Sequence, residues 1–161
     1  GMRPTAATYL FSGGGFGSAY NMDKTPVDVP IPATAKKVEL YAIITGHGSG
    51  TNQCSEFCNH QHEFTVNGHT HLDQFPMAGT QDKCIPNLAN GMTPNQAGTW
   101  WFGRGGWCPG QQVDPWVVDV TAEVTPGQTA TVSYRGLFKN IAPPPDGSGD
   151  IDMVSYLVVY E

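Results

Sequence analysis

Two glycine-rich loops in this sequence bring polar side chains next to cysteines. The first runs over Thr45–Cys58 and holds Glu56 between Cys54 and Cys58, which lie four positions apart. A cross-link between these cysteines would hold the carboxylate in a fixed pose, and polar groups fixed on a rigid scaffold are where binding and catalysis concentrate. We therefore expect Glu56 to be a site residue.

The second loop, Gly103–Gly110, supplies a cation, Arg104. A guanidinium offers a fixed fork of donors that matches a carboxylate or a developing oxyanion. A carboxylate paired with such a cation can activate water and stabilise the tetrahedral intermediate of amide or ester cleavage. The alternative is a structural ion pair between the two loops, and the residue types alone favour it, because ion pairs are common outside active sites.

Tryptophans gather around the second loop, where exposed indoles beside polar groups would stack on sugar rings. The alternative is core packing, because aromatic side chains dominate protein cores. A predicted strand over Thr99–Phe102 would send neighbouring side chains to opposite faces, so at least one of its two tryptophans would be core. We expect Trp107, in the loop, to bind substrate, together with His47 and Trp101. The tryptophans concerned are Trp100, Trp101, Trp107 and Trp116.

A predicted β-hairpin carries several histidines. Asn67-Gly68 separates two short apolar runs, which is the strongest local hairpin signal, and a two-residue turn would pair Phe64 with His71 and Val66 with His69. Three histidines, His62, His69 and His71, would then share one face with Phe64 and Val66, and with His60 nearby the pattern invites a copper or zinc site. The alternative is a polar or half-buried sheet face. Because further ligands are not evident, we expect no metal and no cofactor.

The chain has four cysteines, which allow three disulfide connectivities. We favour the pairs Cys54–Cys58 and Cys84–Cys108. A zinc site is disfavoured, because the cysteine spacing fits it poorly. The alternative is four reduced, buried thiols. Disulfides are typical of exported proteins, so we expect a secreted or periplasmic location.

Composition indicates one all-β domain. Of the 161 residues only 14% are charged, against about 25% in an average globular protein, while 20 glycines and 13 prolines suit short strands and tight turns better than long helices. The net charge is −6 and the eight basic residues form no cluster, so we expect no nucleic-acid partner. No apolar run approaches the ~20 residues of a membrane span, so we expect no membrane partner.

The strand pattern predicts an antiparallel sandwich or jelly roll. Residues 1–35 would form the first strand and the glycine- and proline-rich loops of the same domain, with Gly13–Gly17 as a loop and Thr25–Pro32 as an edge or extended connection. Residues 74–98 would form a long ordered loop. The near-continuous apolar strand Lys37–Thr45 would be buried on both faces or lie in a sandwich core. The other expected strands are Ala7–Phe11, Trp116–Thr121, Thr129–Tyr134 and Met153–Tyr160.

Three motifs carry a family resemblance: Thr45-Gly-His-Gly-Ser49, Cys54-Ser-Glu-Phe-Cys58 and Ala97-Gly-Thr-Trp-Trp-Phe-Gly-Arg-Gly-Gly-Trp-Cys-Pro-Gly110. They closely resemble the carboxy-terminal domain of the bacterial peptide-N-glycosidase F family, over roughly residues 36–161. The resemblance implies a jelly-roll domain in the superfamily that also contains the copper type II, ascorbate-dependent monooxygenases. It also supports both cysteine pairings.

The resemblance further implies a reaction. The family cleaves the amide between an asparagine side chain and the first N-acetylglucosamine of an N-glycan, giving an aspartate and a glycosylamine without a metal. In this comparison Glu56 matches the family's essential glutamate, Arg104 the arginine that supports the catalytic aspartate, and Trp107 a tryptophan near the sugar cleft. The expected partners are therefore an N-glycan or glycopeptide.

The sequence departs from the family in one large respect. The family enzyme has two jelly-roll domains, and its principal catalytic aspartate comes from the amino-terminal one, next to an arginine. This chain has a single predicted domain and no Asp-Arg pair, so it would carry half a site and depend on a second jelly-roll domain outside it. Two alternatives remain: a non-catalytic module that binds glycans or proteins, and a copper-dependent monooxygenase relative suggested by His69-Thr-His71.

Overall fold

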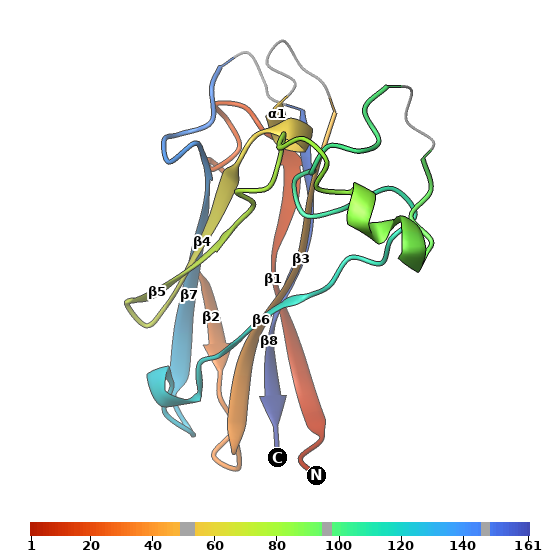
Figure 1. Cartoon of the computed structure of the whole chain (residues 1–161). Coiled ribbons are helices and arrows are strands. Elements are labelled where there is room, and N and C mark those ends of the chain that lie inside the picture. The colour runs from red at the N-terminus through yellow and green to blue at the C-terminus, as the bar shows by residue number, and fades with distance from the viewer. Residues whose placement is uncertain (49–53, 95–97, 146–148) are drawn as a thin grey trace.

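The computed structural model describes residues 1–48, 54–94, 98–145 and 149–161, which fold into one domain (Figure 1). Two four-stranded antiparallel sheets pack face to face, with strand orders β1-β8-β3-β6 and β2-β7-β4-β5. Successive strands alternate between the two sheets in the jelly-roll pattern, except for β4 and β5, which form a hairpin within one sheet. The predicted all-β jelly-roll sandwich is therefore confirmed. The elements are β1 (Pro4–Gly15), β2 (Val27–Pro30), β3 (Lys37–His47), α1 (Cys54–Phe57), β4 (His60–Val66), β5 (His69–Gln74), η1 (Ile85–Asn90), β6 (Trp116–Asp119), η2 (Thr121–Glu123), β7 (Thr129–Phe138) and β8 (Asp150–Tyr160).

The core lies between the two sheets, and β3 shows how the sequence builds it. Val38, Leu40, Ala42 and Ile44 are buried, whereas the residues between them are only half-buried. Because strand side chains alternate between faces, β3 turns one face to the other sheet. Of the two expectations for this strand, the sandwich core is therefore correct and burial on both faces is wrong. The proline-rich connection becomes β2 at the edge of its sheet, as predicted.

The first glycine run differs from its prediction. Gly13, Gly14 and Gly15 belong to β1 instead of forming a loop; Gly14 and Gly15 pair with β8, and Gly13 lies at a register shift between the two strands. A Cβ atom on Gly13 would lie 1.7 Å from the carbonyl oxygen of Ile151. Glycine is therefore required there by the close approach of two strands and not by a turn.

The predicted hairpin is confirmed in its register. Asn67 and Gly68 join β4 to β5 with φ angles of 47° and 86°, the positive values that a two-residue hairpin turn of this kind demands. Phe64 faces His71 and Val66 faces His69, as the spacing predicts.

The predicted strand over Thr99–Phe102 is wrong. This segment forms a turn in which the Phe102 amide donates to the Thr99 carbonyl at 3.2 Å. The carbonyls of Trp100 and Phe102 accept from the Arg104 guanidinium instead of from a neighbouring strand. The side chain of one arginine thus satisfies backbone groups that a strand would have paired.

The loops of interest lie at one end of the sandwich. α1 is at the end opposite both chain termini (Figure 1). The predicted loop Thr45–Cys58 is a strand end, an undescribed stretch and a one-turn helix, since residues 49–53 lie outside the described residues. Residues 95–97, including Ala97 of the third motif, also lie outside them. Within the described ranges no helix has the length and apolarity needed to cross a membrane.

Candidate functional site

The structure brings Glu56 and Arg104 together. Arg104 Nε donates to Glu56 Oε1 at 2.8 Å, with the arginine side chain fully buried and the glutamate side chain 15% exposed. Both disulfides form as favoured, Cys54–Cys58 beside Glu56 and Cys84–Cys108 beside the second loop. The pair therefore joins the two glycine-rich loops, as the sequence predicts, and leaves the carboxylate as the partner that reaches solvent.

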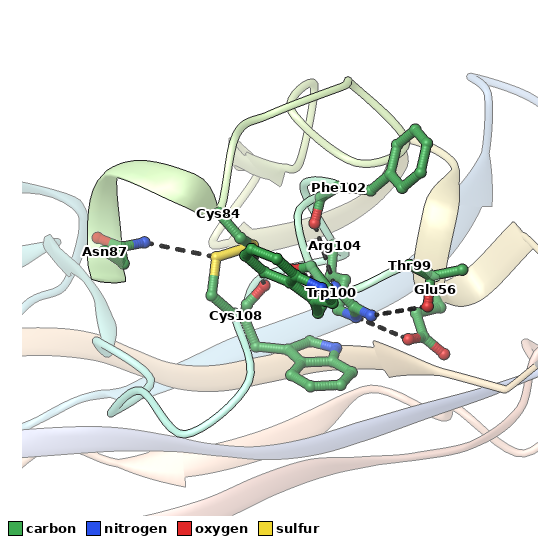
Figure 2. Close-up of a disulfide and its surroundings, with 9 residues drawn as sticks. Glu56, Cys84, Asn87, Thr99, Trp100, Phe102, Arg104 and Cys108 are labelled. Carbon is green, nitrogen blue, oxygen red and sulfur yellow. Dashed lines mark hydrogen bonds and ion pairs between the residues drawn. A yellow bond between two sulfur atoms is a disulfide. The ribbon is translucent and has the colours of Figure 1, made fainter. Parts of the chain in front are cut away.

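The rest of the Arg104 guanidinium is bound to its own loop (Figure 2). Nη1 donates to the carbonyls of Trp100 at 3.3 Å and Phe102 at 3.2 Å, and Nη2 donates to Thr99 Oγ1 at 3.3 Å. Four donor contacts to described residues account for most of the five that a guanidinium offers. A buried charge tolerates burial only when it is paired in this way. Arg104 is thus held in place by its own contacts, and it in turn positions Glu56.

Close backbone contacts set the position of the α1 turn. The carbonyl oxygen of Ser55 lies so near Gly46 and Gly105 that a Cβ atom would approach it to 1.8 Å at the first and 2.5 Å at the second. The Gly105 amide donates to the Glu56 carbonyl at 2.8 Å, and the Gly46 amide donates to the Gly105 carbonyl at 2.7 Å. Glycines in the two loops therefore allow three chain segments to meet at Glu56. Sequence reasoning missed this contact, although glycines flanking both His47 and Arg104 are its signal.

Trp107 and His47 extend the cluster on the Arg104 side. Trp107 Nε1 donates to the Gly46 carbonyl at 2.8 Å, and its ring centre lies 5.0 Å from the Arg104 guanidinium carbon. The His47 ring packs on Trp107 with centres 4.9 Å apart, and His47 Nε2 lies 2.7 Å from Thr45 Oγ1. Two of the three residues expected to bind substrate are therefore neighbours of the Glu56–Arg104 pair.

Trp101, the third of these residues, lies in the turn Thr99–Phe102. Its half-buried ring packs edge-to-face on Trp100 at 5.4 Å and stacks on Phe102 at 5.7 Å. Its carbonyl accepts from the Cys84 amide at 2.9 Å. The expected split of Trp100 and Trp101 between two faces is wrong because the segment is a turn, and both rings are half-buried.

Two grooves open beside these residues. One, of about 400 Å³, is lined by Arg104 and Trp107 together with the amide side chains of Gln74, Asn87, Gln111 and Gln112. The other, of about 630 Å³, is lined by His47, Thr45, Ser12 and two carboxylates, Asp150 and Asp152. Amides beside an aromatic ring can hydrogen-bond to a hydroxyl-rich ligand that stacks on the ring, so the first groove has the chemistry of a sugar subsite.

The histidines of the hairpin lie at different depths although they share a face. His62 is buried, His71 Nε2 lies 2.8 Å from Glu123 Oε2, and His69 is exposed. Burial lowers the pKa of His60 to about 4 and, with the neighbouring His60, holds the pKa of His62 well below its usual range. Within the described ranges, no three His, Cys, Asp or Glu side chains are grouped so that they could hold a metal ion.

These features define a jelly-roll domain in which a buried arginine binds and positions a partly exposed carboxylate. Residues 16–159 match the family described as peptide-N-glycosidase F, C terminal. The match covers most of the chain, so the chain belongs to this family.

The relatives show how much of a longer protein this chain resembles. It is 30% identical over 115 residues to peptide-N(4)-(N-acetyl-β-D-glucosaminyl)asparagine amidase F of Elizabethkingia miricola, a stretch that is 67% of this chain and 30% of that protein. A solved peptide-N(4)-(N-acetyl-β-D-glucosaminyl)asparagine amidase aligns with a TM-score of 0.74 and 21% identity, over 97% of this chain and 52% of that one. PNGase F, a glycosylasparaginase from Flavobacterium meningosepticum, aligns at 0.66 and 20% identity, over 96% and 51%. The chain therefore spans about a third of the curated relative and half of the solved chains.

Proposed function

We propose that this chain is the carboxy-terminal half of a peptide-N-glycosidase F-like amidase, which hydrolyses the amide between asparagine and N-acetylglucosamine in N-linked glycans. The observation that carries the proposal is the partly exposed Glu56 carboxylate bonded to a fully buried Arg104 at 2.8 Å. Membership of the family supports the reaction class. A purely structural ion pair would not need one partner to reach solvent while the other is held by four contacts.

The geometry supports a division of roles within the pair. Arg104 binds Glu56 Oε1, so Oε2 is the oxygen that accepts from a water or a substrate amide. Because most donors of Arg104 are bound to its own loop, this arginine acts mainly by orienting Glu56.

The nucleophile-activating group belongs, in this proposal, to a second jelly-roll domain outside the chain. The curated relative is about three times as long as its matched part, and the resemblance places the family's catalytic aspartate in the amino-terminal domain. The chain alone would then bind a glycopeptide weakly and turn it over slowly or not at all. The two disulfides support a secreted or periplasmic setting.

The test is release of the glycan from an N-glycopeptide, followed by mass spectrometry. The chain is assayed alone and joined to the amino-terminal domain of a peptide-N-glycosidase F-like enzyme. We expect the joined protein to leave aspartate at the glycosylated position and the chain alone to leave the glycopeptide intact. Equal rates of glycan release from the two proteins would contradict the proposal that this chain holds only half of the active site. No release of glycan by a folded joined protein would contradict the proposed amidase function.

A second candidate is a non-catalytic glycan-binding module. The groove of about 400 Å³ beside Trp107, with its four amide side chains, favours it over a protein-binding role. Binding of the isolated chain to a glycan array, lost in Trp107→Ala and retained in Glu56→Gln, would support this candidate. Absence of binding in the unmodified chain would remove it.

A further inference from the structure

A chain of buried polar side chains crosses the core and ends at the turn that carries Glu56. Tyr20 Oη lies 2.6 Å from Tyr134 Oη, which lies 2.7 Å from His62 Nδ1. His62 Nε2 lies 2.7 Å from His60 Nδ1, and His60 Nε2 lies 3.0 Å from the carbonyl oxygen of Ser55. All four side chains are buried, and two of them fully.

The hydrogen bonds of this chain can run in only one direction while both histidines are neutral. A carbonyl oxygen only accepts, so His60 Nε2 must donate to Ser55 and His60 Nδ1 must accept. His62 Nε2 therefore donates to His60, and His62 Nδ1 accepts from the Tyr134 hydroxyl, which accepts from Tyr20. The burial that lowers the pKa of both histidines keeps them neutral at pH 7. Each link thus fixes the tautomer of the next.

The last link acts on the residue that precedes Glu56. The turn α1 has only four residues, and its Ser55 carbonyl lies against Gly46 and Gly105, where no side chain fits. If His60 carried its proton on Nδ1, its Nε2 lone pair would face the Ser55 oxygen and repel it. The tautomer of His60 therefore decides whether the α1 turn is held in place.

We propose that His60 and His62, supported by Tyr134 and Tyr20, are positioning residues that fix Glu56 through the Ser55 carbonyl. Glu56 follows Ser55, where this series of hydrogen bonds ends, and its side chain takes no part in the series. The catalytic meaning of this positioning rests on the proposed amidase function, whereas the positioning itself can be measured on the isolated chain without any substrate.

The first measurement is the tautomer of each histidine in the unmodified protein, from its ring nitrogen chemical shifts by NMR at pH 7. We expect both His60 and His62 to be neutral with the proton on Nε2. A charged ring, or a proton on Nδ1 in either residue, would overturn the proposal. This result needs no variant and so does not depend on whether a substituted chain folds.

The second measurement uses amide hydrogen exchange at two reporters of the turn. The Gly105 amide donates to the Glu56 carbonyl, and the Cys58 amide donates to the Cys54 carbonyl. In His62→Phe the buried His60 Nδ1 loses its donor, so the His60 ring holds the Ser55 carbonyl less firmly and we expect exchange about tenfold faster at both amides. In His62→Gln the side chain both donates and accepts, so we expect rescue of both signals.

Ser155→Ala is the matched control. Ser155 is a buried hydroxyl with two hydrogen bonds, both to the backbone of Phe11 in the neighbouring strand β1 of the same sheet, so its loss lowers stability without removing any link between Tyr20 and Ser55. Faster exchange at Gly105 and Cys58 in Ser155→Ala, in proportion to its loss of stability, would overturn the proposal, as would failure of His62→Gln to rescue. Absence of glycan release by a joined enzyme would count against the amidase alone and leave these measurements unchanged.

Discussion

Two arginine–glutamate pairs in the described part of the chain use the same groups in opposite settings. Arg135 binds Glu63 across neighbouring strands with two hydrogen bonds, Nε to Oε1 at 3.0 Å and Nη2 to Oε2 at 3.3 Å, and its side chain is 59% exposed. Arg104 binds Glu56 through one hydrogen bond at 2.8 Å and is fully buried. The better fork geometry therefore belongs to the solvated pair.

The difference shows that pairing geometry alone does not identify a site. Solvent weakens the attraction in an exposed pair, and such pairs contribute about 0–1 kcal/mol to stability. Water does not reach the buried Arg104 guanidinium, so its hydrogen bonds come from Glu56 and from its own loop instead. Glu56 is thus paired with a buried arginine that also donates to Thr99, Trp100 and Phe102 (Figure 2), whereas Glu63 is paired with an exposed arginine.

The largest expected effect comes from removing the buried anchor. Arg104→Leu leaves Glu56 without its cation and leaves the Trp100 and Phe102 carbonyls without their donor. We expect a loss of about 3–5 kcal/mol in the free energy of unfolding, measured by urea denaturation. Arg135→Leu is the matched control, with an expected loss of at most about 1 kcal/mol. Equal losses in the free energy of unfolding would show that the two pairs contribute equally to stability.

Acid sensitivity should come from three buried groups, two of which are the histidines behind the Glu56 turn. His60 has a pKa of about 4 when folded because of burial, against 6.5 unfolded, so between these values the unfolded chain binds more protons and stability falls as the pH falls. His62 adds a second contribution of the same sign. Asp73 opposes them, because burial raises its pKa to about 6 and the folded chain then binds the extra proton.

Between pH 6 and pH 5 the two histidines together outweigh Asp73, so the free energy of unfolding should fall as the pH falls. In Asp73→Asn the opposing group is gone, so the fall should be steeper, by up to about 1.4 kcal/mol per pH unit. Urea denaturation of both proteins at several pH values in this window measures the slopes. A slope that is flat, or shallower in the variant, would contradict the buried neutral histidines.

Glu56→Gln should have an intermediate effect on stability. The amide oxygen still accepts from Arg104 Nε, but the buried guanidinium loses its countercharge. We expect a loss of about 1–3 kcal/mol, measured by thermal denaturation, against less than about 0.5 kcal/mol for Glu63→Gln. A more stable Glu56→Gln would instead mean that Glu56 is strained in its native pose.

The smallest effect concerns salt. In a double-mutant cycle the coupling between Glu63 and Arg135 should fall from about 0.5 kcal/mol towards zero in 1 M NaCl, because exposed charges are screened. The coupling between Glu56 and Arg104 should change little, because salt does not reach a buried guanidinium. Equal screening of the two couplings would show that water reaches Arg104.

Much of the fold could be predicted from the sequence because its signals are local. The Asn67-Gly68 turn sets the register of its hairpin, and the apolar pattern of Lys37–Ile44 marks a central strand. The strand predicted over Thr99–Phe102 failed because its partner is the guanidinium of Arg104, which no local pattern reveals. The loop predicted over Gly13–Gly17 failed in its first part for a similar reason, since the neighbouring β8 strand, far away in sequence, is what requires glycine at Gly13.

The candidate site, too, could be predicted from the sequence only where its signals are local. Glu56, Arg104 and Trp107 stand out by residue type and motif, and the structure brings them together. The buried chain through His60 and His62 could not be predicted, because the sequence shows histidines on alternate strand positions and not the tyrosines that reach them from other elements. Of the histidines that suggest metal ligands, His60 and His62 belong to a hydrogen-bonded series that leads to the Glu56 turn, whereas His71 contacts Glu123 and His69 is exposed.

The most direct test of the central claim compares the two glutamates by activity. Each of Glu56→Gln and Glu63→Gln is placed in the chain joined to an amino-terminal domain, and the initial rate of glycan release from an N-glycopeptide is measured. We predict a fall of about 100-fold or more for Glu56→Gln and an unchanged rate for Glu63→Gln. A Glu56→Gln protein that releases glycan at the unmodified rate would contradict the assignment of Glu56 as the carboxylate that this domain contributes.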